Sequence, residues 1–178
     1  MPDTFAYPLS EFYSHAKLPL PRIEQVAADA LPEPHRALLA HSNDMTSTLE
    51  GFHKSPVHIE LLRRERRGDF YFREVVLRRD SDDKPVEFGA IKIFISRFPD
   101  DAQDMILREE APLGRILKDC KVAHRAEAKT FLRIESDAVM AEHLALASPA
   151  TLYGRKAVIS DPQNRPLAEI VEILPPPA

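Results

Sequence analysis

The spacing of apolar side chains changes along the chain, from a helical period before residue 57 to strand-like alternation after it. Over residues 21–30, 34–41 and 42–52 the apolar positions recur as on short helices, and Pro21 occupies the first turn of the first one. Beyond residue 57, apolar and polar residues alternate, which is typical of strands that bury one face. This alternation predicts strands over residues 57–61, 70–77, 86–95, 128–134, 152–159 and 166–174. Further helices are predicted over 100–107, 112–118 and 136–146, with a charged turn over 63–68.

Short polar turns separate most of these strands, so the sheet is expected to consist of hairpins and to be mainly antiparallel. Runs of strands and helices of this kind place the chain in the α+β class. The 178 residues, 44% of them hydrophobic, suffice for one ordinary domain with its own core. We see no linker or internal repeat, and we expect a single domain over residues 1–178.

Composition excludes several classes of function. The net charge of -4 argues against nucleic acid as the main partner, because phosphate binding requires a surplus of basic residues. No apolar run is long enough to span a bilayer, and the N-terminus shows no secretory signal. A single cysteine, Cys120, excludes an internal disulfide and paired-cysteine metal sites. We expect a cytoplasmic protein, a monomer or small homo-oligomer, with no metal and no cofactor.

Arg73 is the first candidate for chemistry. It alternates onto the same strand face as Tyr71, Val75 and Leu77, and an arginine on an apolar face needs an anionic partner because it stays charged. That partner is either a ligand or a neighbouring glutamate, and the strand alone favours the glutamate.

The last strand carries two glutamates on opposite faces, Glu169 and Glu172. If one face is buried, one of these carboxyl groups lies inside the protein, where its pKa rises and it can hold a proton for donation. A salt bridge to a strand arginine is an equally good explanation. Lys92 is a candidate second cation, although an outward-facing lysine is the commoner case. Gly154-Arg155-Lys156 suggests an anion site, but a basic strand start is the simpler interpretation.

The order of these signals resembles that of chorismate lyase, which converts chorismate to 4-hydroxybenzoate and pyruvate without a cofactor. The likeness is carried by five short blocks: Asn43–Glu50, Val57–Arg63, Phe72–Leu77, Pro112–Leu117 and Leu152–Pro175. The resemblance implies the chorismate lyase-like (UTRA-like) fold, an antiparallel sheet of about six strands with helices on one side. It also implies that residues 43–175 form the matching region, that residues 1–42 are a helical lead-in, and that two flaps close over a small anionic cyclic substrate.

Site residues follow from the same resemblance. Arg73 is similar to the arginine that grips the ligand carboxylate, and Glu172 to the glutamate near the breaking ether bond. Met45 and Leu113 match flap positions at the ligand, and Arg125 matches a supporting position. The chain departs from the family at Ala90, where a second arginine is expected and for which Lys92 could substitute. An ungapped count also places Val171 at the position of the glutamate, and residues 135–150 add a helix.

Three functions remain open on this basis. The first is a carbon–oxygen lyase acting on chorismate, in ubiquinone or secondary-metabolite biosynthesis, with Arg73 and Glu172 as catalytic residues. The second keeps the fold for a cyclase or isomerase acting on another cyclic substrate. The third is a ligand-sensing module of the kind found in certain transcription regulators. The third is less expected, because residues 1–42 are too short and too rich in proline for a helix-turn-helix domain.

Overall fold

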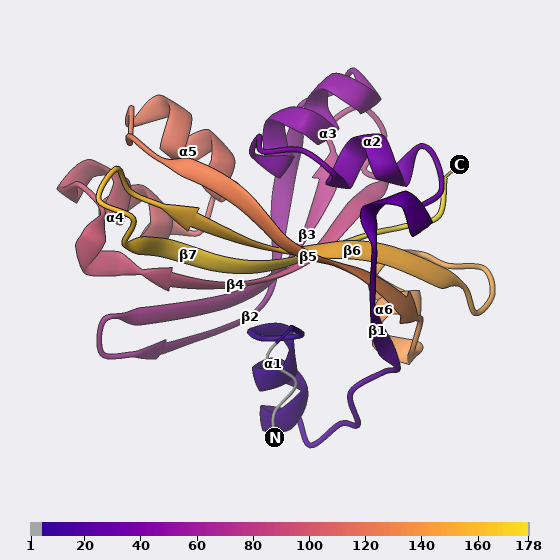
Figure 1. Ribbon diagram of the computed structural model, residues 1–178. Coiled ribbons are helices and arrows are strands. Elements are labelled where there is room, and N and C mark those ends of the chain that lie inside the picture. Colours follow the sequence, from indigo (N-terminus) through magenta and orange to yellow (C-terminus); the bar gives the residue numbers. More distant parts are fainter. Residues whose placement is uncertain (1–4, 178) are drawn as a thin grey trace.

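Hairpins set the order of the sheet in the computed structural model, which describes residues 5–177. Seven antiparallel strands are found in this part of the chain, in the order β1-β5-β6-β7-β4-β3-β2 (Figure 1). Their bounds are β1 Ile23–Val26, β2 Val57–Arg67, β3 Phe70–Arg79, β4 Pro85–Phe94, β5 Arg125–Glu135, β6 Thr151–Ser160 and β7 Pro166–Leu174. The last strand, β7, pairs with both β6 and β4, and so joins the two hairpin regions into one sheet.

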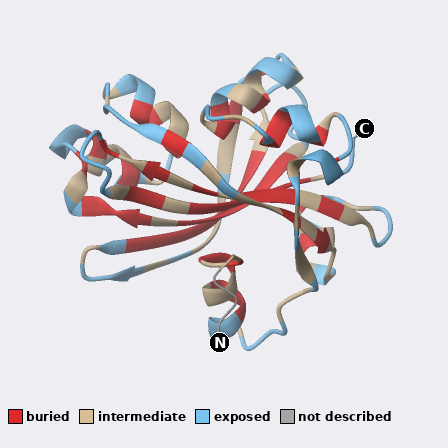
Figure 2. Ribbon diagram, viewed as in Figure 1, coloured by how far each residue is buried: buried red, intermediate tan, exposed pale blue. Residues whose placement is uncertain are grey.

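Helices lie on both faces of this sheet (Figure 1). One face carries α2 (His35–Leu39), α3 (Met45–His53), α4 (Asp100–Arg108) and α5 (Leu113–Asp119). The opposite face carries α1 (Leu9–His15) and α6 (Ala138–His143), and short 3-10 turns occupy Ala28–Ala30 and Ile95–Arg97. The central strands are therefore buried on both sides, while the outer surfaces of the helices are exposed (Figure 2). None of the helices formed by residues 5–177 is long and apolar enough to cross a membrane.

Strand alternation sends side chains into different hydrophobic clusters. On the α1 face, Phe72, Val76, Phe88 and Val171 pack beneath α1 and α6. On the other face there are two separate clusters. One packs α4 and α5 against strand residues such as Ile93, and the second packs α2 and α3 against strand residues that include Leu77, Val86 and Leu174. The space between these two clusters is where the site lies.

The predicted elements are largely confirmed, with three corrections. Residues 21–30 are not a helix, because Ile23–Val26 pairs with β5 as an edge strand and a 3-10 turn follows. The charged stretch 63–68 is not a turn, because β2 continues to Arg67 beside β3. Charged side chains suit such an edge strand, since they oppose pairing with other chains. The helix predicted over 136–146 is shorter, and its N-cap is Asp137, whose side chain accepts a hydrogen bond from the Met140 N–H.

Candidate functional site

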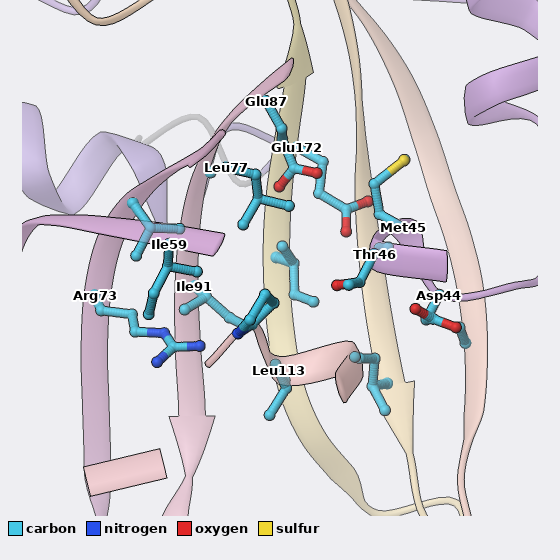
Figure 3. A pocket seen from close by; sticks show the side chains of 18 of the residues that line it. Asp44, Met45, Thr46, Ile59, Arg73, Leu77, Glu87, Ile91, Leu113 and Glu172 are labelled. Carbon is cyan, nitrogen blue, oxygen red and sulfur yellow. The ribbon is translucent and has the colours of Figure 1, made fainter. Parts of the chain in front are cut away.

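A cavity lies on the α2–α5 face, between the two hydrophobic clusters. Strands β3, β4, β6 and β7 form its floor, and the first turns of α3 and α5 border it (Figure 3). Its volume is about 50 Å³, which is room for a few water molecules. A ligand the size of benzene occupies a cavity of roughly 150 Å³. A ring-sized ligand therefore requires α3 and α5 to move away from the sheet.

A row of residues on four adjacent strands forms the middle of the floor. The register pairs Val75 with Gly89, Gly89 with Glu172, and Glu172 with Arg155. Gly89 matters because a β-carbon at this position would lie 2.9 Å from Oε1 of Glu87. The missing side chain leaves the space into which the two carboxyl groups, Glu87 and Glu172, project together (Figure 3).

Arg73 lies at the other end of the cavity from these carboxyl groups (Figure 3). Its side chain is only 2% exposed, and Nη2 donates a hydrogen bond to the Ala111 carbonyl at 3.2 Å. Nε and Nη1 are buried without an acceptor, and no carboxylate within residues 5–177 forms an ion pair with this guanidinium. Burial lowers the pKa of Arg73, but an arginine side chain stays protonated in proteins. The cavity thus contains a positive charge that is not neutralised by a direct contact.

The neighbouring acids are occupied elsewhere. Glu74 follows Arg73 in the strand and therefore lies on the opposite face, 3.3 Å from Nε of Arg63. Glu109 accepts a hydrogen bond from the Tyr71 hydroxyl at 2.7 Å and pairs with Arg64 at 2.5 Å. The alternative in which Arg73 pairs with a glutamate of its own protein is therefore not what the structure shows.

Arg155, in contrast, is fully engaged by the protein. Nε donates to Oε2 of Glu172 at 2.6 Å, and the remaining nitrogens donate to the backbone carbonyls of Leu39, His41 and Asn43. Both side chains of this ion pair are buried. The pair fixes the segment that leads into α3, so Arg155 positions one border of the cavity and has little capacity left for a ligand.

Glu87 is the second acid beside this pair. Its side chain is buried, and Oε2 has no hydrogen-bond partner in the described structure. Burial raises the pKa of Glu87 well above the usual range of a carboxyl group; the nearby Glu172 adds to this effect and Arg155 opposes it. Burial beside Glu172 therefore favours the protonated form of Glu87 over the ionised form.

Helices α3 and α5 meet over the cavity at Gly114. A β-carbon on Gly114 would lie 2.5 Å from Oδ1 of Asp44 and 2.8 Å from Cβ of Thr46. Asp44 is the N-cap of α3, and its side chain accepts the Ser47 N–H at 2.8 Å. Only glycine allows this close approach of the two helix starts.

The structure brings together four of the six residues expected at the site. Arg73, Glu172, Met45 and Leu113 line the cavity, and this also decides between Glu172 and Glu169 in favour of Glu172. The two other predicted residues, Lys92 and Arg125, lie outside the cavity.

Lys92 lies on the α1 face, where its Nζ is 3.7 Å from Glu169 and 4.4 Å from the centre of the Phe70 ring. It is therefore not placed to act as a second cation beside Arg73. Arg125 is exposed at the start of β5 and donates to the Asn164 side chain at 2.9 Å.

Sequence reasoning missed Glu87 altogether and treated Arg155 as a basic strand start. A signal for Glu87 was present, because it alternates with Gly89, Ile91 and Ile93 on one strand face, the same pattern that singled out Arg73. Arg155 gave a weaker signal, since it alternates with Ala157 and Ile159 and lies in a segment that suggested an anion site. Its role depends on carbonyl groups of residues 39–43, more than 110 positions earlier in the chain.

Solved structures of low sequence identity share this fold. PhnF from Mycobacterium smegmatis matches with a TM-score of 0.59 at 15% identity, over 76% of this chain and 65% of PhnF. YydK from Bacillus subtilis, described as a transcriptional regulator, gives 0.53 at 8% identity, over 67% of this chain and 59% of YydK. The ligand-binding domain of a Bordetella bronchiseptica protein, described as a GntR-family transcriptional regulator, gives 0.52 at 14% identity, over 67% and 86%. By sequence, no family model and no curated protein matches the chain.

The expected α+β, chorismate lyase-like fold is thereby confirmed, with a seventh strand, β1, and with α1 and α6 on the second face. The expectation of an enzyme is wrong. Two of the structural neighbours are described as a transcriptional regulator and as the ligand-binding domain of another one, not as enzymes. None of the descriptions of these neighbours names chorismate, 4-hydroxybenzoate or pyruvate.

Proposed function

We propose that this chain is a small-molecule-binding sensor domain whose ligand carries an oxyanion, such as a carboxylate or a phosphate, that binds to Arg73. The observation that carries the proposal is the buried guanidinium of Arg73, with Nε and Nη1 lacking acceptors at the edge of a cavity. A buried guanidinium that has N–H groups without acceptors is costly, and a carboxylate or phosphate can accept from two of these groups at once. The fold shared with a regulator's ligand-binding domain is consistent with this role.

The geometry also describes how binding would be communicated. The cavity of about 50 Å³ lies directly beneath the first turns of α3 and α5. A ligand larger than a few water molecules must displace these helices, whose starts are in contact at Gly114. Binding energy at Arg73 thus favours a different placement of two surface helices. A shift of this kind is what a sensor domain needs in order to pass a signal to a partner.

Thermal unfolding and calorimetric titration test the proposal. The probes are butyrate, benzoate and inorganic phosphate, with benzamide as the uncharged counterpart of benzoate. We expect at least one oxyanion to raise the melting temperature, and benzamide to have no effect. The Arg73→Gln variant should lose about 100-fold or more in affinity, because breaking a buried charged hydrogen bond costs roughly 2–5 kcal/mol.

Arg125→Gln is the matched control, since it removes an exposed arginine that lies outside the cavity. It should bind the same oxyanions as the unmodified protein. Equal affinities of Arg73→Gln and Arg125→Gln, or no response to any of the three oxyanions, would contradict the proposed site.

A further inference from the structure

We propose that the ligand also carries a cationic nitrogen, separated by several bonds from its oxyanion, and that this nitrogen binds at Glu87 and Glu172. The inference rests on the proposed function, because it takes Arg73 as the binding group for the oxyanion. It adds the chemical class of the ligand: a compact zwitterion whose opposite charges lie at its two ends.

The first support is the distribution of charge along the cavity. Arg73 stands at one end, and Glu87 and Glu172 project together at the other (Figure 3). The cation at this end is Arg155, and its hydrogen bonds go to Glu172 and to three backbone carbonyls, not to Glu87. Two carboxyl groups therefore face one guanidinium that is already engaged. The Asp44 carboxylate at the α3 N-cap adds another negative charge to the cavity lining.

The second support is the state of Glu87. Its Oε2 is buried without a hydrogen-bond partner, and Oε1 lies over the bare backbone of Gly89. Burial, together with the nearby Glu172, raises the pKa of Glu87 and so disfavours its ionised form. An ammonium group has three donors and can serve both carboxyl groups at once. Its arrival would make the ionised form of Glu87 favourable, so a proton would leave the site as the cation binds.

The third support is the distance between the two ends. The register pairs Leu77 with Glu87, and Leu77 lies four residues along β3 from Arg73. At about 3.3 Å per residue, the two backbone positions are about 13 Å apart along the strands. An α-amino acid carries both charged groups on one carbon, whereas the cavity places its opposite charges at its two ends. An ω-amino acid places its charges at opposite ends, as the cavity does.

Calorimetry with a matched set of probes tests this inference. The set contains butyrate, 2-aminobutyrate, 4-aminobutyrate, hexanoate and 6-aminohexanoate. We expect 4-aminobutyrate or 6-aminohexanoate to bind at least tenfold more tightly than the carboxylate of the same length, and 2-aminobutyrate to show no such gain. Titrations in two buffers of different ionisation enthalpy should show protons released with the ω-amino acid and none with the carboxylate.

Glu87→Gln should remove the preference for the ω-amino acid and its proton release while leaving carboxylate binding in place. Glu169→Gln is the control, because Glu169 lies on the opposite face beside Lys92. Equal affinity for hexanoate and 6-aminohexanoate in the unmodified protein would overturn the inference and leave the oxyanion site standing. A preference for 6-aminohexanoate over hexanoate that persists in Glu87→Gln would also overturn the inference. If the unmodified protein binds none of these probes, both proposals are overturned. The comparison of hexanoate with 6-aminohexanoate uses the unmodified protein alone, so it does not depend on whether Glu87→Gln folds.

Discussion

Arg73 and Glu74 are consecutive residues of β3, yet they occupy two very different polar clusters. Arg73 faces the cavity, where Nε and Nη1 have no acceptor. Glu74 faces α1, where Arg63 lies 3.3 Å away and Asp137 accepts a hydrogen bond from Tyr13 at 2.7 Å. Because successive side chains of a strand point to opposite faces, the two charges cannot neutralise one another. A sheet covered on both sides can therefore keep a buried charge available on one face.

The two clusters also differ in what they hold together. On the α1 face, Arg63 also donates to the Phe12 carbonyl at 3.3 Å, so sheet, α1 and α6 are joined by contacts within the protein. On the cavity face, the Arg155–Glu172 pair is complete, whereas Nε and Nη1 of Arg73 and Oε2 of Glu87 lack hydrogen-bond partners. The carboxyl oxygens of Glu74 also lack hydrogen-bond partners, but they lie beside Arg63 beneath α1. The unpartnered groups of Arg73 and Glu87 instead line the cavity, where a ligand can reach them.

Removing Arg155 should give the largest effect, and removing Arg63 a much smaller one. Arg155→Ala leaves Glu172 and three backbone carbonyls without their donors in a buried site. Breaking a buried ion pair in this way costs about 3–5 kcal/mol. Arg63→Ala should cost only about 1 kcal/mol, because Arg63 is partly exposed and Glu74 can keep its proton.

Chemical denaturation of the two variants at pH 7 measures both costs. The slope of unfolding free energy against denaturant should stay unchanged, so that the midpoints report stability directly. Equal losses in the two variants would show that the clusters do not differ in the way the contacts imply.

Glu74 should make stability depend on pH. Burial, and to a lesser extent Asp137, raise its pKa from 4.5 to about 7, with Arg63 acting in the opposite direction. Between these values the folded protein binds a proton that the unfolded chain has lost, so stability falls as pH rises from about 4.5 to 7. A shift of this size corresponds to about 3 kcal/mol. Glu74→Gln should lose this part of the slope and exceed the unmodified protein in stability at pH 8.

Unfolding curves between pH 4 and 8 provide the measurement. Glu87 contributes to the same downward slope because its pKa is also raised, so the difference between Glu74→Gln and the unmodified protein is the quantity to follow. Glu127→Gln is the control, since Glu127 is exposed on β5 and pairs with Lys129. A slope that is identical in Glu74→Gln and in the unmodified protein would contradict the assignment.

Local pattern predicted most of the sheet. β7 was expected over the residues that form it, because its alternation and flanking turns are local signals. β1 was mistaken for a helix, since four residues with Ile23 and Val26 at its ends suit either structure. The decision is made by pairing with Ile134 and Phe131 on β5, about 100 positions away. Such pairing has no trace in the local sequence.

The site shows the same division between local and distant information. Arg73 was found because a charge on an apolar strand face is visible in the sequence, and Glu87 carried the same signal. The side chain of Glu172 faces the cavity because of the register between β7 and β4, which no count along one strand can supply. Lys92 was placed on the wrong face for a related reason. The register between β3 and β4 pairs Arg73 with Ile91, so Ile91 shares the face of Arg73 and Lys92 lies on the opposite face.

The cover of the cavity gives the smallest and most local test of the comparison. Gly114→Ala should place a β-carbon within 3 Å of Asp44 and Thr46, so that the starts of α3 and α5 must separate. Overpacking of this kind costs about 1–3 kcal/mol, and the higher helix propensity of alanine returns up to about 1 kcal/mol.

Gly51→Ala is the control. Gly51 lies in α3 with nothing within 4 Å of the new β-carbon, so this variant should be stabilised by the higher helix propensity of alanine alone. Denaturation midpoints that move in opposite directions would show that the cavity is covered by two helices in a glycine-dependent contact. Midpoints that both rise would show that α3 and α5 already have room to part, and that the close contact at Gly114 does not hold them together.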